Sequence, residues 1–404
     1  MLFVANAQLY KGDNLHICTF SHLHINQAFA HSHICTLTKH LHIKKTLPLT
    51  SFLRFISWLA VLALWGCAAT VFVDSSVYGK YFAPIGLAFP FCVAAVVGCI
   101  ILCLLFKPRL TWIGVLGLIA CCGSLRDYAP INLSSPAPKG AIKVLSYNIM
   151  NWNNWAMTPD STNYETIQYL TSQKPDIACL QEITFKNEEE IKRIDRIFSH
   201  AGYKLSCDFV GGNRIGIITK WPVIKSQVIT HSEGNGAIAF YLEWPRRGDT
   251  LIVITAHLES MHLSQKERDK YHTLVKRPEE ADTIHGKLDL IRKIAQSGTV
   301  RARQADTLST FVDQHRDTPL ILMGDFNDTP ISYAHHKICS RLTDCYRATA
   351  NGIGRSFNRD AIYVRIDNIF CSSHFKPFAV RVDDTVPFSD HYPIIGYLKP
   401  VKRK

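Results

Sequence analysis

The sequence is most informative at Leu320-Ile321-Leu322-Met323-Gly324-Asp325-Phe326-Asn327, where an apolar run ends in polar residues. Four apolar residues bounded by turn residues predict a short buried β-strand. Asp325 and Asn327 are two residues apart, so their side chains point the same way at an extended strand end, and Gly324 permits close backbone approach. An Asx turn that closes the strand would explain Asn327 alone. The whole group therefore indicates a strand that delivers polar side chains to a site.

The same arrangement recurs at five other places along the chain. Polar residues stand at the ends of apolar runs as Asn148 after 144–147, Gln181-Glu182 after 177–180, His257 after 251–256, Asp367 within 365–370, and Ser389-Asp390-His391 before 392–395. Rigid strands that repeatedly bring polar groups to one rim are what a preorganised site requires. We therefore expect the six segments to meet at a single functional site.

Short apolar runs from residue 141 onward predict a layered α/β domain. Strands are predicted at 142–147, 177–181, 215–219, 237–242, 251–256, 320–323, 366–371 and 394–398. Helices are predicted at 162–171, 188–200 and 300–315. Strands and helices in this mixed order are typical of layered α/β folds.

These junctions resemble, in residue type and in order, those of the endonuclease/exonuclease/phosphatase (DNase I-like) superfamily. The resemblance runs from about residue 141 to 398 and includes all six junctions. It implies a four-layered α/β sandwich, in which two packed mixed β-sheets are flanked by helices. The apolar segments in front of the domain, and Asp328-Thr329-Pro330 after Asn327, are most similar to a membrane-anchored bacterial branch.

The resemblance implies a Mg²⁺ site, with Mn²⁺ as a substitute ion. Its ligands would be Glu182, as the principal ligand, with Asn148 and Asp390. Mg²⁺ keeps several waters and takes one or two protein carboxylates, so this set is chemically sufficient. Taken singly, Glu182 could be a solvated carboxylate at a helix entry, and Asn148 a turn or cap residue.

The resemblance also implies the groups that move protons. His391 and Asp367 would form a catalytic dyad, because a His held against a carboxylate has a fixed tautomer and a raised basicity. Asp325 would orient or deprotonate the nucleophile, or protonate the leaving oxygen. By itself, Ser389-Asp390-His391 could be a loop with a satisfied His.

Phosphate binding is the role that the resemblance implies for His257 and Asn327. His257 would also be catalytic, as a donor to the negative charge that accumulates in the transition state. A single His is more often a core residue, and that reading of His257 stays open. Asn213 and Arg214, which precede the strand at 215–219, are further candidates for facing the phosphate.

The first third of the sequence has the composition of a membrane protein. The chain has 404 residues and a formal net charge of +12; through residue 138 only three carboxylates stand against nine Lys and Arg. Apolar segments at about 55–73, 81–106 and 110–125 predict three transmembrane helices, although the third is short enough for a re-entrant piece. A wholly soluble protein and a purely integral membrane protein are both excluded.

The chain is thus expected to have four parts: a disordered cytosolic extension at 1–50, a membrane region at 51–126, a Pro-rich linker at 127–140 and a catalytic domain at 141–404. Cations gather before the first apolar segment and at 107–109, and cytoplasmic loops collect Lys and Arg. With three spans, the catalytic domain lies on the extracytoplasmic side of the cell (inner or plasma) membrane. If the third segment does not cross, this conclusion reverses.

Together these features predict a membrane-anchored, Mg²⁺-dependent phosphoric ester hydrolase of the phosphodiesterase or endonuclease type, which attacks a phosphate ester with activated water. The alternatives are a phospholipid or sphingomyelin phosphodiesterase and a catalytically inactive membrane-tethered binding module. The expected partners are the membrane, which the chain crosses several times, and a phosphate-ester substrate, either nucleic acid or phospholipid. No protein partner can be inferred. The polar insertion at 261–300 could clasp either substrate, or form an amphipathic helix or a lid.

Overall fold

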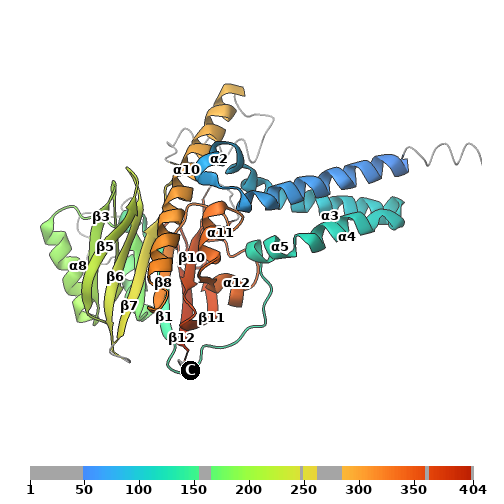
Figure 1. Cartoon of the computed structure of the whole chain (residues 1–404). Helices are drawn as coiled ribbons and strands as arrows, with labels where there is room; N and C mark the ends of the chain where they lie inside the picture. The colour runs from blue at the N-terminus through green and yellow to red at the C-terminus, as the bar shows by residue number, and fades with distance from the viewer. Residues whose placement is uncertain (1–48, 154–164, 246–248, 262–283, 360–363, 402–404) are drawn as a thin grey trace, which may run out of the picture.

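The computed structural model of the chain describes residues 49–153, 165–245, 249–261, 284–359 and 364–401. Two six-stranded β-sheets pack face to face, and helices cover their outer faces (Figure 1). The expected four-layered α/β sandwich is therefore confirmed. A group of apolar helices projects from one side of it (Figure 1).

Each sheet is mixed. The first sheet has the order β11 (Phe375–Val382), β12 (Ile394–Pro400), β1 (Ile142–Asn148), β2 (Ile177–Gln181), β4 (Asn213–Thr219) and β3 (Lys204–Val210). The second has the order β5 (Val223–His231), β6 (Gly236–Trp244), β7 (Asp249–His257), β8 (Leu320–Asp325), β10 (Asp367–Cys371) and β9 (Thr343–Asp344). The pairs β1–β2 and β7–β8 are parallel, and the other neighbours are antiparallel.

Helices close the two outer faces. On the first sheet lie α6 (Met150–Asn153), α7 (Glu165–Ser172) and α8 (Glu188–His200), and on the second lie α10 (Ile284–Gln314) and α11 (Tyr333–Cys339). Helix α12 (Cys345–Thr349) lies at the edge of the sandwich, where it contacts β11 of the first sheet and β10 of the second. Leu170 of α7 and Phe198 of α8 share a buried apolar cluster with Tyr147 of β1, and Leu308 of α10 shares another with Ile254 of β7. Strands β2 and β8 are buried along their whole length. Because both of their faces are covered, their sequences are near-continuous apolar runs.

All eight predicted strands are present, but the structure adds four more. The additional strands are β3, β5, β9 and β11, and each is an outermost strand of its sheet. Strand β5 is mostly exposed and β3 is largely exposed or half-buried, so their sequences lack the apolar runs of the central strands.

The predicted helix at 188–200 is confirmed, whereas the one at 300–315 was too short. Helix α10 begins at Ile284, because its first half packs against a short helix, α2 (Ser75–Phe82), and not against the sheet. Part of the expected polar insertion is therefore helical, and residues 262–283 lie outside the described ranges. Helix α7 begins at Glu165, and residues 162–164 also lie outside them.

Two helices of the described chain are long and apolar enough to cross a membrane, Leu49–Phe72 and Ile85–Phe106. The first ends in a 3₁₀ turn (η1, Thr70–Phe72); the second comprises a 3₁₀ turn (η2, Ile85–Ala88) and α3 (Phe89–Phe106). A third apolar stretch returns as Pro108–Ala120, made of a 3₁₀ turn (η3, Pro108–Leu110) and α4 (Thr111–Ala120), and then α5 (Cys122–Tyr128), with a bend of 63°. It counts as a span only if the bent pair is one helix.

The expected second segment began too early, at residue 81. Tyr81 and Phe82 belong to α2, which Asp74 starts by accepting a hydrogen bond from the Ser76 N–H. The chain then turns through Pro84 into the second apolar helix. The extension at 1–48 lies outside the described residues.

Candidate active site

The second sheet aligns three of the predicted residues in one row. Asp325 ends β8, where it pairs with His257 of β7 on one side and with Asp367 of β10 on the other. Paired positions on neighbouring strands present their side chains on the same face, so the three groups lie together. Asp325 and Asp367 are almost fully buried. The register of one sheet thus joins residues more than a hundred positions apart.

The first sheet contributes Asn148 and Glu182 to the same place. Asn148 ends β1, and Glu182 follows directly after β2. The amide nitrogen of Asn148 donates to Oε1 of Glu182 at 3.0 Å and to Oδ2 of Asp325 at 3.2 Å, and so links the two sheets. Glu182 has a φ of 57°, which is uncommon for a side chain other than glycine. A hydrogen bond from the Ile183 N–H to the Arg214 carbonyl holds this turn.

His391 and Asp367 form the expected pair. Nδ1 of His391 lies 2.9 Å from Oδ2 of Asp367, and Nε2 lies 3.6 Å from Oδ2 of Asp325. The ring of Phe357 packs edge-on against the imidazole, with centroids 5.1 Å apart. Carboxylates on both sides and an aromatic contact therefore fix the orientation of this buried ring.

Burial and neighbouring charges set the protonation of the row. Burial raises the pKa of Asp325 to about 6; Asp367 adds to the rise, while His391 and His257 oppose it. Burial alone would lower the pKa of His391, but Asp367 and Asp325 together raise it to about 10. At neutral pH the imidazole therefore holds a proton between the two carboxylates and is a donor in this state.

His257 and Asn327 lie beside the row with different partners. Nε2 of His257 is 3.8 Å from Oε1 of Glu182 and 3.6 Å from Oδ2 of Asp325. Its Nδ1 is 3.3 Å from the side-chain amide nitrogen of Asn213; because an amide nitrogen only donates, Nδ1 accepts and Nε2 carries the hydrogen. The amide of Asn327 donates to the Leu258 carbonyl at 2.9 Å. His257 thus presents a donor to the centre of the site, whereas Asn327 joins the loops after β7 and β8.

The loop that carries Asp390 is held at the site by hydrogen bonds of its backbone and of Ser389. The hydroxyl of Ser389 donates to the Asn148 carbonyl at 2.7 Å, and the Asn358 N–H donates to the Asp390 carbonyl at 2.9 Å. The carboxylate of Asp390 contacts the Ser389 hydroxyl at 3.4 Å. The loop that carries Asp390 and His391 is therefore fastened directly to the end of β1.

The donor set fits a hard divalent cation. Oxygens of Glu182 and Asp325 converge on one amide nitrogen of Asn148, and Oδ1 of Asp367 is buried without a hydrogen-bond partner in the described part of the chain. Asp325, Asp367 and His391 each place a ligand atom within 4.8 Å of the others. Oxygen-rich groups with excess negative charge are what Mg²⁺ or Mn²⁺ prefers. The carboxylate of Asp325, which was not among the predicted metal ligands, thus lies near that of Glu182.

Several positioning residues were not predicted. The Ser356 hydroxyl accepts hydrogen bonds from the N–H groups of Ile366 and Asp367, at 2.9 and 3.0 Å, and so fixes the start of β10. Ser389 stands within the quoted Ser-Asp-His motif, but nothing in the sequence marks Ser356. Arg214, a candidate for phosphate, stacks against the rings of Phe185 and Phe209 at 4.9 and 4.0 Å instead.

A second group of metal-ligand types, His335, Cys339 and Asp344, lies elsewhere under the second sheet. The guanidinium of Arg365, which is fully buried, lies 2.8 Å from Asp344, and Nε2 of His335 lies 3.1 Å from the same carboxylate. Burial alone would raise the pKa of Asp344, but Arg365 and His335 hold it well below its usual range. The carboxylate is thus already neutralised, and the group is a buried ion-pair network.

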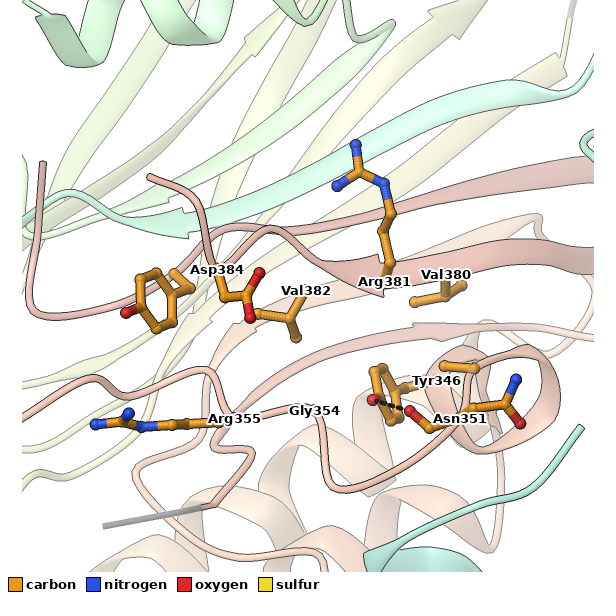
Figure 2. Close-up of a pocket in the computed structure, with 10 residues that line it drawn as sticks. Tyr346, Asn351, Gly354, Arg355, Val380, Arg381, Val382 and Asp384 are labelled. Atoms are coloured by element: carbon orange, nitrogen blue, oxygen red, sulfur yellow. Dashed lines mark hydrogen bonds between the residues drawn. The ribbon is translucent and has the colours of Figure 1, made fainter. Parts of the chain in front are cut away.

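A pocket of about 450 Å³ lies next to the loop of His391, between β11 and the segment after α12 (Figure 2). Arg355 lines it but donates to the carbonyls of Phe357 and Asn358, at 2.9 and 2.7 Å. Arg381 points away from Tyr346 across the pocket (Figure 2) and lies 3.4 Å from Asp383. Because Phe357 pairs with His391, Arg355 supports the segment that holds the histidine.

Comparison with known families identifies the fold as that of a phosphoesterase- or nuclease-type hydrolase. Residues 162–391, more than half of the chain, match the model of the Endonuclease/Exonuclease/phosphatase family. The chain belongs to this family. Residues 50–128 match the model of a domain of unknown function. A comparison with curated proteins gives no match.

Solved structures similar to the chain share little sequence with it. The catalytic domain of human Nocturnin with a bound sulfate anion is 17% identical, over 67% of this chain and 96% of that one, with a TM-score of 0.44. An endonuclease/exonuclease/phosphatase family protein from Bacteroides thetaiotaomicron is 17% identical, over 65% and 98%, with a TM-score of 0.44. The 3′ phosphatase NExo from Neisseria, bound to a product DNA hairpin, is 16% identical, over 64% and 100%, with a TM-score of 0.45.

Proposed function

We propose that the chain is a membrane-associated, divalent-metal-dependent phosphoric ester hydrolase of the phosphodiesterase type, which transfers a phosphoryl group to water. Membership of the family supports the hydrolase class. The position of Asp325, 3.6 Å from Nε2 of both His257 and His391, is the observation that carries the proposal. It sets one carboxylate, which can accept a proton from water, between two histidines that can donate to a phosphate.

In this proposal, Asp325 orients the attacking water and accepts its proton. His391 donates a hydrogen bond to the phosphoryl group, and Asp367 keeps the ring oriented and balances its charge. His257, with its Nε2–H directed to the centre, stabilises the negative charge that grows on the non-bridging oxygens. Asn327 has a second amide hydrogen for the same purpose.

Glu182, with Asp390 and the side-chain oxygen of Asn148, would hold a divalent cation at the edge of this group, with Asp325 beside it. The amide of Asn148 would turn to do so, because its nitrogen now faces both carboxylates and its oxygen accepts from the Met150 N–H. The bound cation would supply charge neutralisation on the phosphoryl and leaving oxygens. Four carboxylates, at positions 182, 325, 367 and 390, outnumber the two histidines of the site. This excess of negative charge disfavours an anionic substrate until a cation binds.

We also propose a multi-pass arrangement in the cell membrane, with the catalytic domain outside the cytosol and with the membrane region, the linker and the catalytic domain in the order expected from the sequence. The apolar helices run back and forth beside one another, with the beginning of the helix Leu49–Phe72 and the turn between α3 and α4 at the end far from the sandwich (Figure 1). The cations Lys107 and Arg109 lie at that far end, which supports a cytosolic location for it.

Hydrolysis of bis(p-nitrophenyl) phosphate by the full chain in detergent, with Mg²⁺ or Mn²⁺ and with EDTA, tests this function. We expect turnover that needs the metal and that His391→Gln abolishes. His200→Gln on the exposed face of α8 is the matched control and should keep full activity. Metal-independent turnover, or an active His391→Gln protein, would overturn the proposal.

A further inference from the structure

Helix α2, which joins the first two apolar helices, has two contrasting faces. On one face, Gly79 and Ala83 pack against Thr299 and Gly298 of α10 so closely that a Cβ at either glycine would collide with its neighbour. On the opposite face, Val77, Tyr78 and Tyr81 are 62%, 52% and 61% exposed. At 100° per residue these three side chains fall within one quarter to one third of the helix circumference.

The linker after α5 has the same two-sided character. The side-chain amide of Asn132 donates to the carbonyls of Arg347 and Ala350, at 3.0 and 2.6 Å, and its backbone N–H donates to Asn351. Its neighbours Ile131 and Leu133 are 87% and 96% exposed. In an extended chain, residues on either side of an inward-facing one point outward. The protein therefore fixes two apolar side chains in solvent-facing positions.

These two surfaces lie where the apolar helices meet the sandwich. Helix α2 stands between the helices Leu49–Phe72 and Ile85–Phe106, and Ile131 is three residues beyond the end of α5 (Figure 1). Tyrosine is enriched where spanning helices leave the hydrocarbon, because its ring is apolar and its hydroxyl prefers water. The occupant that this position favours is the headgroup layer of the bilayer that the helices cross.

We propose that Val77, Tyr78, Tyr81, Ile131 and Leu133 form a bilayer-contacting rim, which seats the catalytic domain on the membrane surface. The inference rests on the proposed membrane spans. It goes beyond the anchor, because the rim restrains the orientation of the domain as well as its distance from the bilayer.

Helix α10 connects the rim to the loops of the candidate active site. Gly298, which contacts Ala83 of α2, lies one helical turn before Arg301 on α10. Arg301 donates to the Glu259 carbonyl at 3.0 Å and lies 2.9 Å from the carboxylate of Asp328. Glu259 and Asp328 belong to the loops that follow His257 and Asn327. The seat on the bilayer and the phosphate-binding loops thus share one rigid helix.

Photo-crosslinking of the full chain in phosphatidylcholine/phosphatidylglycerol nanodiscs tests the rim. p-Benzoylphenylalanine is placed at Tyr81 or Leu133, at Leu104 in α3 as a span control, and at Ile224 of β5 as an exposed apolar control on an edge strand. We expect lipid adducts at 81, 133 and 104 and a yield at least ten times lower at 224.

Each other outcome overturns the proposal in its own way. Lipid adducts at 104 but not at 81 and 133 would contradict the proposed rim and still support the membrane spans. The absence of a lipid adduct at 104 would contradict the proposed membrane spans as well. Adducts of 81 or 133 with a second copy of the chain would make the surface a protein interface, and equal adducts at 224 would show that lipid contact is not specific to the rim. Because crosslinking does not depend on turnover, it stands apart from the proposed hydrolase activity.

Discussion

Oδ2 of Asp325 lies 3.6 Å from Nε2 of His391, whose Nδ1 in turn lies 2.9 Å from Asp367. One imidazole is therefore held between two buried carboxylates from the neighbouring strands β8 and β10. Removing either carboxylate changes the charge of the ring in a known direction.

Asp367→Asn should lower kcat for a phosphodiester by about 10²- to 10⁴-fold, the range of general acid–base contributions. The reason is that Asp367 is the largest of the influences that raise the pKa of His391. Steady-state kinetics from pH 5 to 10 should also show the basic limb of the profile moving to lower pH. Asp195→Asn, on the exposed side of α8, is the control. Activity within threefold of the unaltered protein would contradict the dyad.

Glu182→Gln should weaken Mg²⁺ binding, because it removes the charged ligand while keeping the shape of the side chain. A ligand that binds only the folded state raises its stability, by about 2.7 kcal/mol at a hundred times its Kd. Millimolar Mg²⁺ should therefore raise the Tm of the unaltered protein and leave that of Glu182→Gln nearly unchanged. Differential scanning fluorimetry measures both without a substrate. An equal shift in the two proteins would exclude Glu182 as a ligand.

Asp344→Asn should cost about 3–5 kcal/mol of stability at neutral pH, since it leaves the buried Arg365 unpaired. The folded-state pKa of Asp344 lies below its ordinary value of 3.8, so the contribution is complete above that pH and is lost as pH falls below it. The Tm difference between the two proteins should be roughly 10 °C at pH 7 and should shrink below pH 4. A difference that grows with acidification would refute this assignment.

Gly79→Val should separate α2 from α10, because the added side chain meets Thr299. We expect at least a tenfold loss of turnover on a phosphodiester held in the bilayer, with hydrolysis of a soluble diester within twofold of normal. Gly66→Val, where an added Cβ has no heavy atom within 4 Å, is the control. Equal losses on both substrates would show that the contact serves stability alone.

The sequence was informative wherever strands are buried on both faces, and silent at the sheet edges. Strands β2 and β8 are buried along their whole length, so their apolar runs are continuous. Strand β5, at an edge, exposes most of its residues and carries Lys225, Ser226 and Gln227. Edge strands avoid apolar runs because those would promote pairing with other chains. The pattern that prevents aggregation thus also hides the strand from sequence reasoning.

The candidate site was predictable for a related reason. Asp325, His257 and Asp367 end or begin strands whose positions were clear, and the sheet register then aligns them. The proton position on His391 was not predictable, since it depends on two carboxylates that approach only in the fold. Nor was Ser356, whose hydroxyl matters only because backbone N–H groups from β10 happen to face it.

The tail of α5 is built into the catalytic unit. Asp127 forms an ion pair with Arg347, and its carbonyl accepts a hydrogen bond from the buried Arg365 at 3.4 Å. Asn132 donates hydrogen bonds to the carbonyls of Arg347 and Ala350 in the same region. A truncated protein that starts at residue 139, where the composition becomes that of a globular domain, would strip these partners from both arginines. A fragment made for expression should therefore begin before Asp127. Such a fragment is shorter than the full chain and keeps the contacts that Asp127 and Asn132 make with the catalytic domain.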